Sequence, residues 1–412
     1  MEGLKTDRST VIGAVAIALF AAAAGYNAGP VPRETDQASL INGAWQLKHG
    51  APARGAVFYN YDKQFLAYAI VAAFLPSSSA PLDEREIDRL VGRANLGTAL
   101  LLSASLAAWW FSRRRRPGAT DGLALVALLA APAFLLSAPF ASAAAISAAF
   151  VILLTAVLGR VSSPIKPWLA AGATFLAVGA RADAVLCLPL LCWSNARVSS
   201  WRSTFRDPVH WAMAIAAVAA LGAGYWLAGA RSATWYGGYF EPRVFGAYLV
   251  FGLGAMLLPG GFALAATARF AFRRGNLFGF AAAGPLFLLL PLGFYGWQLF
   301  SPRHLIPLLV TIFGYVASRR GRAAWRWWRR ENPRAALLAV RAAFVCALVP
   351  LFAGLDFADS DRFPAVTVRN PTLYPTTDGL WPMGAAGTFL FRLGRAAEQP
   401  VDHNQALWLA IR

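Results

Sequence analysis

One polar and aromatic segment, residues 34–70, contains the side chains best suited to chemistry. It follows the first long apolar run, with Asp36 near its start and Lys63 near its end. A carboxylate within about 2.6 to 3.2 Å of a hydroxyl group can remove its proton, and an ammonium group can donate hydrogen bonds to a phosphate. We therefore predict that Asp36 is a general base and that Lys63 binds the phosphate of a lipid substrate.

Three further basic residues are predicted to bind the same phosphate, namely Arg181, Arg303 and His304. The last two lie between apolar runs, where Pro302 and Pro307 interrupt regular helix. A charge at bilayer depth costs about 2.5 to 3.5 kcal/mol, so such a residue usually has a partner. An anionic phosphate would be that partner, although an isolated arginine can also extend its side chain to the interface.

Four other residues are candidates for substrate contacts: Tyr59, Tyr61, Asp62 and Asp183. The tyrosines could stack on a sugar, or they could be ordinary interface aromatics. The two acids could also complete a divalent-ion site. The chain has no HExxH motif, no Walker-type glycine loop and no paired CxxC. We therefore assign no metal ligands and no cofactor, leave a divalent metal open, and find no support for ATP-driven transport.

The composition indicates that a membrane-spanning fold positions these residues. Of the 412 residues, 58% are hydrophobic and 14% are charged, and apolar runs of roughly 20 residues match the thickness of the bilayer core. The three cysteines lie within apolar runs and offer neither a disulfide framework nor metal-ligand spacing. The net charge of +18 comes from arginines in short loops, as in cytoplasmic loops, so it indicates topology and not nucleic acid.

The apolar pattern predicts an all-α polytopic membrane protein with about eleven transmembrane helices within residues 1–355. The predicted apolar runs are 11–28, 93–111, 123–139, 141–158, 167–193, 211–228, 245–270, 277–300, 305–317 and 335–355. Residues 356–412 form a small extracytoplasmic tail in this interpretation. The Trp-Arg segment 319–334 is predicted to be a membrane-interface loop that meets anionic lipid, in preference to a nucleic-acid patch.

The basic loops predict the topology. They place the N-terminus in the cytoplasm and residues 33–88 outside; a cleaved signal peptide is the alternative for the first run. Basic residues flank the run 167–193 on both sides, so the chain must cross twice or dip in and return, with a turn near residues 179–183. A single span is the alternative, and it would invert the topology downstream.

Two stretches resemble a known family. Asp36-Gln37, Gly50 and Tyr61-Asp62-Lys63-Gln64-Phe65-Leu66 resemble the first outer loop of the GT-C glycosyltransferases, in particular the group of lipid A aminoarabinose transferases and protein O-mannosyltransferases. Arg303-His304-Leu305-Ile306-Pro307 is similar to their Arg-Tyr-x-x-Pro element. Gln37 stands where the family has a second acid, and Gln64-Phe65 where it has Pro-Pro.

The resemblance implies a GT-C type bundle whose outer first loop carries juxtamembrane helices. It further implies an inverting transferase of the inner membrane that takes a sugar from a polyprenyl-phosphate donor on the outer face. The acceptor would be an envelope glycan, lipid or protein. Asp36 would correspond to the catalytic base and Lys63 to a ligand of the donor phosphate. A transporter or flippase, and a non-catalytic envelope scaffold, remain as alternatives.

Overall fold

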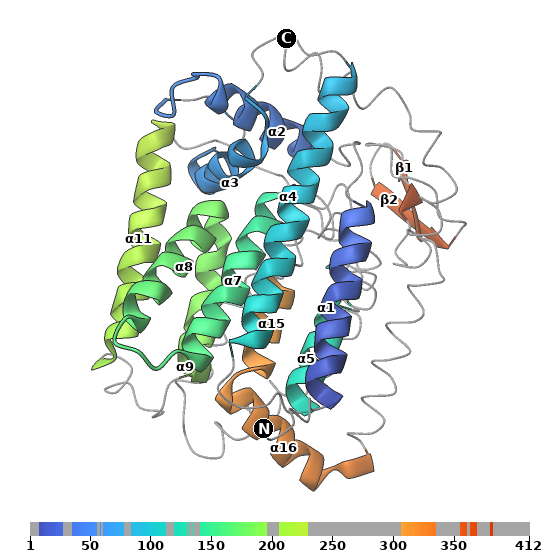
Figure 1. The fold of residues 1–412 in the computed structure, drawn as a ribbon, viewed down its shortest axis with the longest axis vertical. Coiled ribbons are helices and arrows are strands. Elements are labelled where there is room, and N and C mark those ends of the chain that lie inside the picture. The colour runs from blue at the N-terminus through green and yellow to red at the C-terminus, as the bar shows by residue number, and fades with distance from the viewer. Residues whose placement is uncertain are drawn as a thin grey trace, which may run out of the picture.

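The computed structural model is a bundle of helices (Figure 1). It describes residues 8–27, 35–55, 58, 61–77, 84–112, 119–129, 131, 134, 141–195, 206–229, 306–334, 355–360, 363–368 and 380–381. The helices are α1 (Arg8–Asn27), α2 (Thr35–Lys48), α3 (Tyr61–Phe74), α4 (Glu84–Phe111), α5 (Ala119–Leu129), α7 (Ala143–Arg160), α8 (Lys166–Ala180), the 3₁₀ helix η1 (Ala182–Cys187), α9 (Leu188–Asn195), α11 (Pro208–Ala228), α15 (Ile306–Val316) and α16 (Arg319–Glu331).

Three of the described helices are long and apolar enough to cross a membrane: residues Arg89–Phe111 of α4, all of α7 and all of α11. The prediction of a helical membrane protein is confirmed to the extent of these three helices. The number of about eleven spans stays a prediction, because the apolar runs at 245–270, 277–300 and 335–355 lie outside the described residues.

The outermost of these helices, α11, exposes the side chains that a lipid-facing helix needs. Ile215 and Val218 are 65% and 70% exposed, and Trp211 and Trp226 are exposed near the two ends. The two tryptophans lie about 22 Å apart along the helix axis, and tryptophan favours the membrane–water interface. This distribution suits a helix with one side in lipid and its ends at the two headgroup layers.

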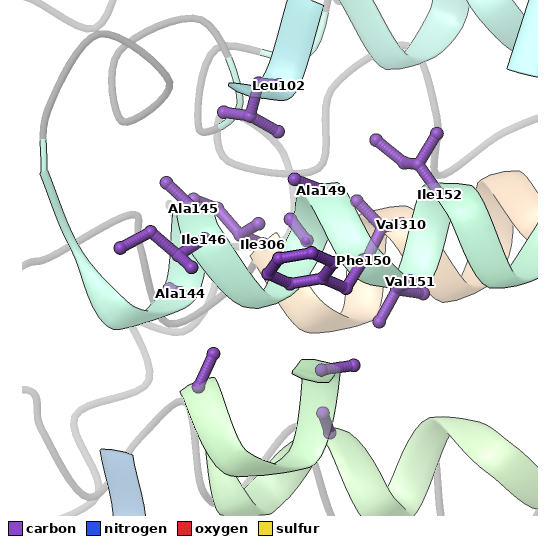
Figure 2. Close-up of a cluster of buried hydrophobic side chains, with 14 of the residues drawn as sticks. Leu102, Ala144, Ala145, Ile146, Ala149, Phe150, Val151, Ile152, Ile306 and Val310 are labelled. Carbon is purple, nitrogen blue, oxygen red and sulfur yellow. The ribbon is translucent and has the colours of Figure 1, made fainter. Parts of the chain in front are cut away.

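At the centre of the bundle, α7 is buried on nearly all sides by α4, α8 and α15. Figure 2 shows Ile146 and Phe150 of α7 among Leu102 of α4 and Ile306 and Val310 of α15. Seven of its residues are alanine or glycine, and small residues let helices approach closely where lipid provides no hydrophobic driving force. The apolar core therefore follows α7.

Side-chain contacts between helix ends define two ends of the bundle. The Trp110 indole nitrogen donates to the Thr10 carbonyl oxygen at 3.3 Å, and Arg160 donates to the Ser112 hydroxyl at 3.2 Å. The start of α1 and the last residues of α4 and α7 thus lie together, near α16 (Figure 1). We call this the α16 end and the opposite one the α3 end.

The predicted helix break near residues 179–183 is confirmed. Helix α8 stops at Ala180, Arg181 is extended (φ −159°, ψ 113°), and η1 begins at Ala182. At the start of α8, the Lys166 ammonium group donates to the Leu158 carbonyl oxygen at 2.8 Å, and α9 ends at Asn195, beside Gly159. Both ends of the segment therefore meet the end of α7, so the segment dips in and returns, and the single-span alternative is wrong.

Two further segments differ from the expectations. Residues 319–331, predicted as a loop, form the helix α16. The segment at the start of the predicted tail contains the strands β1 (Leu355–Ser360), β2 (Phe363–Val368) and β3 (Leu380–Trp381). They pair antiparallel in the order β2-β1-β3, and the sequence analysis did not predict them.

Glycines on α11 give a direct test of this packing. A Cβ atom on Gly224 would lie 2.2 Å from the Asp62 carbonyl oxygen of α3, whereas nothing lies within 4 Å of one on Gly222. We expect Gly224→Ala to destabilise the protein by about 1 to 3 kcal/mol through overpacking, and Gly222→Ala to be neutral or slightly stabilising. Thermal unfolding of both purified variants measures this, and equal melting temperatures would contradict the α3–α11 contact.

Candidate functional site

The segment predicted to be catalytic forms two short helices, α2 and α3, at one end of the bundle (Figure 1). The turn after α2 contains Gly50 and Gly55, both at positive φ (97° and 75°), which glycine adopts without strain. The Gly55 amide nitrogen donates to the Leu227 carbonyl oxygen at 2.6 Å. The loop is thereby attached to the last turn of α11.

Helices α2 and α3 lie side by side and run in the same direction. Gly43 of α2 contacts the Tyr68 ring of α3. Further along, the Lys48 ammonium group donates to the carbonyl oxygen of Ala72 at 3.2 Å and to that of Leu75, where a cation is favourable at the helix C-terminus. These contacts share nearly the same offset along the two helices, so α2 and α3 are parallel neighbours.

The first turn of α3 rests on the ends of α8 and α11. Phe65 and Leu66 pack against Gly179, and the carbonyl group of Asp62 lies against Gly224. Gln64 has a non-helical backbone (φ −149°, ψ 28°), so α3 is kinked directly after Lys63. This packing brings Asp62 and the exposed Lys63 to the same end of the bundle as the helix break at Arg181.

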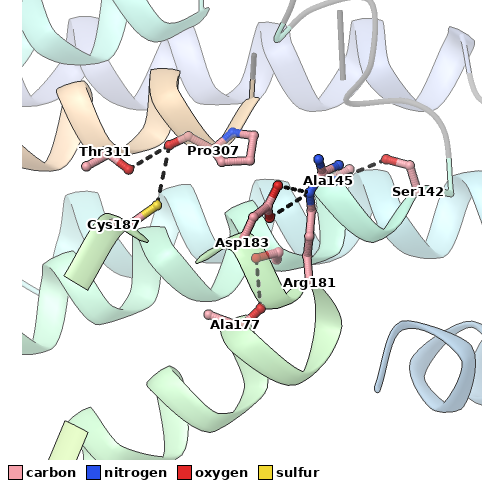
Figure 3. Close-up of polar contacts among 9 residues, drawn as sticks. Ser142, Ala145, Ala177, Arg181, Asp183, Cys187, Pro307 and Thr311 are labelled. Atoms are coloured by element: carbon pink, nitrogen blue, oxygen red, sulfur yellow. Dashed lines mark hydrogen bonds and ion pairs between the residues drawn. The ribbon is translucent and has the colours of Figure 1, made fainter. Parts of the chain in front are cut away.

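Arg181 and Asp183 form an ion pair at the break (Figure 3). The Arg181 Nε atom donates to both carboxylate oxygens of Asp183, at 2.7 and 2.8 Å, and the two side chains are 19% and 18% exposed. The sequence analysis gave them separate roles, in phosphate binding and in substrate binding. The bond through Nε compensates the charge of Arg181 within the protein.

The short helix α15 begins beside this break. The Cys187 sulfur lies 3.7 Å from the Pro307 carbonyl oxygen, which also accepts a 2.6 Å hydrogen bond from the Thr311 hydroxyl (Figure 3). Helix α8 is fixed to α7 in the same region, because the Ser147 hydroxyl donates to the Ala177 carbonyl oxygen at 2.9 Å. The break after α8, the kinked helix α3 and the start of the short helix α15 therefore lie at the same end of the bundle.

Gln37, next to the predicted base, has a structural role that the sequence analysis missed. Its side chain is 3% exposed, and its amide nitrogen donates to the Asn95 side-chain oxygen of α4 at 2.5 Å. The Ala141 backbone nitrogen donates to the same oxygen at 2.9 Å. This contact fixes the first turn of α2 to α4. The one available signal was Asn95 itself, an amide within an otherwise apolar helical run.

Tyr61 is buried by other aromatic rings. It is 3% exposed and makes edge-to-face contacts with Phe58 and Tyr68, with ring centroids 5.3 and 5.4 Å apart. Burial raises the pKa of its hydroxyl group, so the phenol stays protonated at neutral pH. These contacts give Tyr61 a packing role in the α3 turn, and its contact with substrate stays a prediction.

Part of the predicted site lies outside the described residues: Tyr59, Arg303, His304 and the side chain of Asp36. Arg303 and His304 precede Ile306, the first residue of α15, by three and two positions. Among the side chains that the structure describes, no three of His, Cys, Asp or Glu are grouped as metal ligands would be.

No family model, no curated protein and no solved structure matches this chain.

The Gln37–Asn95 contact can be tested by its effect on stability. Asn95→Ala leaves the Gln37 amide and the Ala141 backbone nitrogen without their common acceptor, at about 1 to 3 kcal/mol for each buried group. We expect a melting temperature several degrees lower in the purified protein. The control is Asn42→Ala in α2, which removes the acceptor of an exposed hydrogen bond from Gln46. It should change the free energy of unfolding by less than about 0.5 kcal/mol. Equal effects of the two substitutions would argue against the anchor.

Proposed function

We propose that the protein is an integral membrane glycosyltransferase that moves a sugar from a polyprenyl-phosphate donor to an envelope glycan, lipid or protein, with inversion. One observation carries the proposal: α3 docks on Gly179 and Gly224, which brings Asp62 and Lys63 to the end of the bundle where helix α8 breaks at Arg181. Asp36 lies in the first turn of α2, the helix that packs beside α3. Charged residues of separate segments are thus grouped where a lipid-linked substrate can reach them from the membrane.

In this mechanism Asp36 accepts the proton of the acceptor hydroxyl as that oxygen attacks the anomeric carbon. The lipid phosphate leaves from the opposite face, so the configuration inverts. Lys63 and Arg181 stabilise the charge that develops on the leaving phosphate, and Arg303 and His304 are further candidate donors. Asp183 holds the Arg181 guanidinium by its Nε atom, which orients that group.

The charge distribution supports an orientation for the protein. The α16 end carries Arg160, Lys166, Arg206 and the arginines of α16, whereas the α3 end carries acids and bases together. By the positive-inside rule the α16 end faces the cytoplasm. The N-terminus is then cytoplasmic, because α1 begins at that end, and the site lies on the extracytoplasmic side of the inner membrane.

A flippase for a lipid-linked anionic substrate is the second candidate. Transporters build their substrate sites from broken helices, and the α8–η1–α9 segment, which dips into the bundle and returns, has that character. A flippase would move labelled polyprenyl-phosphate sugar across a liposome bilayer without an acceptor. A transferase would instead release free polyprenyl phosphate only when an acceptor is present.

The proposed base is tested with Asp36→Asn, which keeps the shape of the side chain but cannot accept the proton. Purified protein is incubated with a panel of polyprenyl-phosphate sugars and with envelope extract as acceptor, and the released polyprenyl phosphate is measured. We expect transfer to fall by roughly 100-fold or more, while binding of polyprenyl phosphate changes little. Full transfer by Asp36→Asn would rule out Asp36 as the base.

The phosphate site is tested by binding of polyprenyl phosphate alone. Lys63→Ala should weaken this binding about 10- to 100-fold, because a charge-assisted hydrogen bond contributes roughly 1.5 to 3 kcal/mol. Arg206→Ala is the matched control, since it removes an exposed positive charge at the α16 end, and we expect it to have no effect. Equal weakening by both substitutions would mean that net charge, and not a local site, attracts the phosphate.

A further inference from the structure

Helix α16 begins at a tight turn that fixes its direction. The Ser318 hydroxyl accepts a hydrogen bond from the Gly321 amide nitrogen at 3.0 Å, which caps the helix. A Cβ atom on Gly321 would lie 2.0 Å from the Tyr315 carbonyl oxygen, so this close return of the chain requires glycine. Helix α16 therefore leaves α15 at an angle and lies at the end of the bundle (Figure 1).

Contacts hold α16 to α9, to α5 and to the turn after α15. Trp325 is 5% exposed, and the Arg320 guanidinium lies over the Trp193 ring of α9, 4.8 Å from its centroid. Arg322 donates to the Asp121 carboxylate of α5 at 3.3 Å and to the Ala317 carbonyl oxygen of the preceding turn at 2.8 Å. These contacts give two of the arginines of α16 partners within the protein.

Four other arginines of α16 are exposed: Arg319, Arg326, Arg329 and Arg330. We call their surface the arginine face. Arg319, Arg326 and Arg330 are seven and four positions apart, which places them along one line of the helix. Glu331 is the one acid in α16. The arginine face therefore concentrates positive charge on the exposed surface of α16.

The aromatic residues around α16 indicate its depth. Trp168 and Trp211, in the first turns of α8 and α11, are 78% and 52% exposed at this end of the bundle. Exposed tryptophans on membrane helices lie at the level of the lipid headgroups. Trp193, which stacks with Arg320, lies in the last turns of α9 at the same end. Helix α16 is thus expected at the headgroup layer.

We propose that the arginine face of α16 binds the headgroups of anionic phospholipids. Arginine forms bidentate hydrogen bonds to phosphate, and basic residues close to an anionic leaflet are attracted to it within about one Debye length, roughly 8 to 10 Å. Single-stranded nucleic acid, in contrast, is bound with aromatic side chains on which its bases stack. Trp325 packs against the bundle and is not exposed for this purpose.

The test compares two triple variants of the full-length protein in detergent. Arg326→Gln, Arg329→Gln and Arg330→Gln together neutralise the arginine face, and Arg54→Gln, Arg89→Gln and Arg93→Gln remove the same charge from exposed positions at the α3 end. Affinities for short-chain phosphatidylglycerol and phosphatidylcholine are measured. We expect the first triple to weaken phosphatidylglycerol binding by about tenfold or more, and the second to change it less than about twofold.

Several outcomes would overturn the proposal. One is an equal loss of phosphatidylglycerol affinity in both triple variants, which would mean that net charge alone attracts the lipid. Another is an unchanged affinity in the first triple variant. A third is equal binding of glycerol 3-phosphate and phosphatidylglycerol, which would mean anion binding without a lipid surface. A fourth is that a 20-nucleotide RNA binds more tightly than phosphatidylglycerol and that the first triple variant abolishes this RNA binding. If the first triple does not fold, the variant with lysine at the same three positions should retain the preference for phosphatidylglycerol, and loss of that preference would contradict the proposal.

Discussion

The candidate site depends on the close approach of α3 to two glycines, Gly179 at the end of α8 and Gly224 near the end of α11. Because neither position has a Cβ atom, the α3 backbone at Asp62 and the side chains of Phe65 and Leu66 fit directly against the two helix ends. In a membrane, where apolar side chains gain little by leaving lipid, such close contact is a main source of helix association. The position of Lys63 and the kink at Gln64 follow from this contact.

The break at Arg181 complements that contact. The extended residue Arg181 interrupts regular helix between α8 and η1 and places a charged pair within an apolar bundle. Non-helical backbone of this kind is tolerated where it is buried in protein or lines a cavity. The ion pair with Asp183 reduces the cost of holding Arg181 there. In the proposed mechanism the same pairing orients the guanidinium group of Arg181. Helices α7 and α15 support the break through Ser147 and Pro307.

Local features of this architecture could be predicted from sequence, and contacts between distant segments could not. The turn after α2 and the break near Arg181 are marked by glycine and by charged residues within apolar runs. The hydrogen bond from Gln37 to Asn95 joins positions 58 residues apart. The sequence alone does not indicate which residue of a distant helix Gln37 would contact. The interleaved Trp and Arg between two apolar runs predict an interface loop, whereas residues 319–331 form a helix. The packing of Trp325 and the contacts of Arg320 and Arg322 stabilise that helix.

A structure of the protein in lipid nanodiscs with polyprenyl phosphate would test the account most directly. The account predicts density for the phosphate between the first turn of α3 and the Arg181 break, within hydrogen-bond distance of Lys63, with the lipid chain running into the bilayer. Density for the polyprenyl phosphate only at a place away from Lys63 and Arg181 would contradict the proposed site.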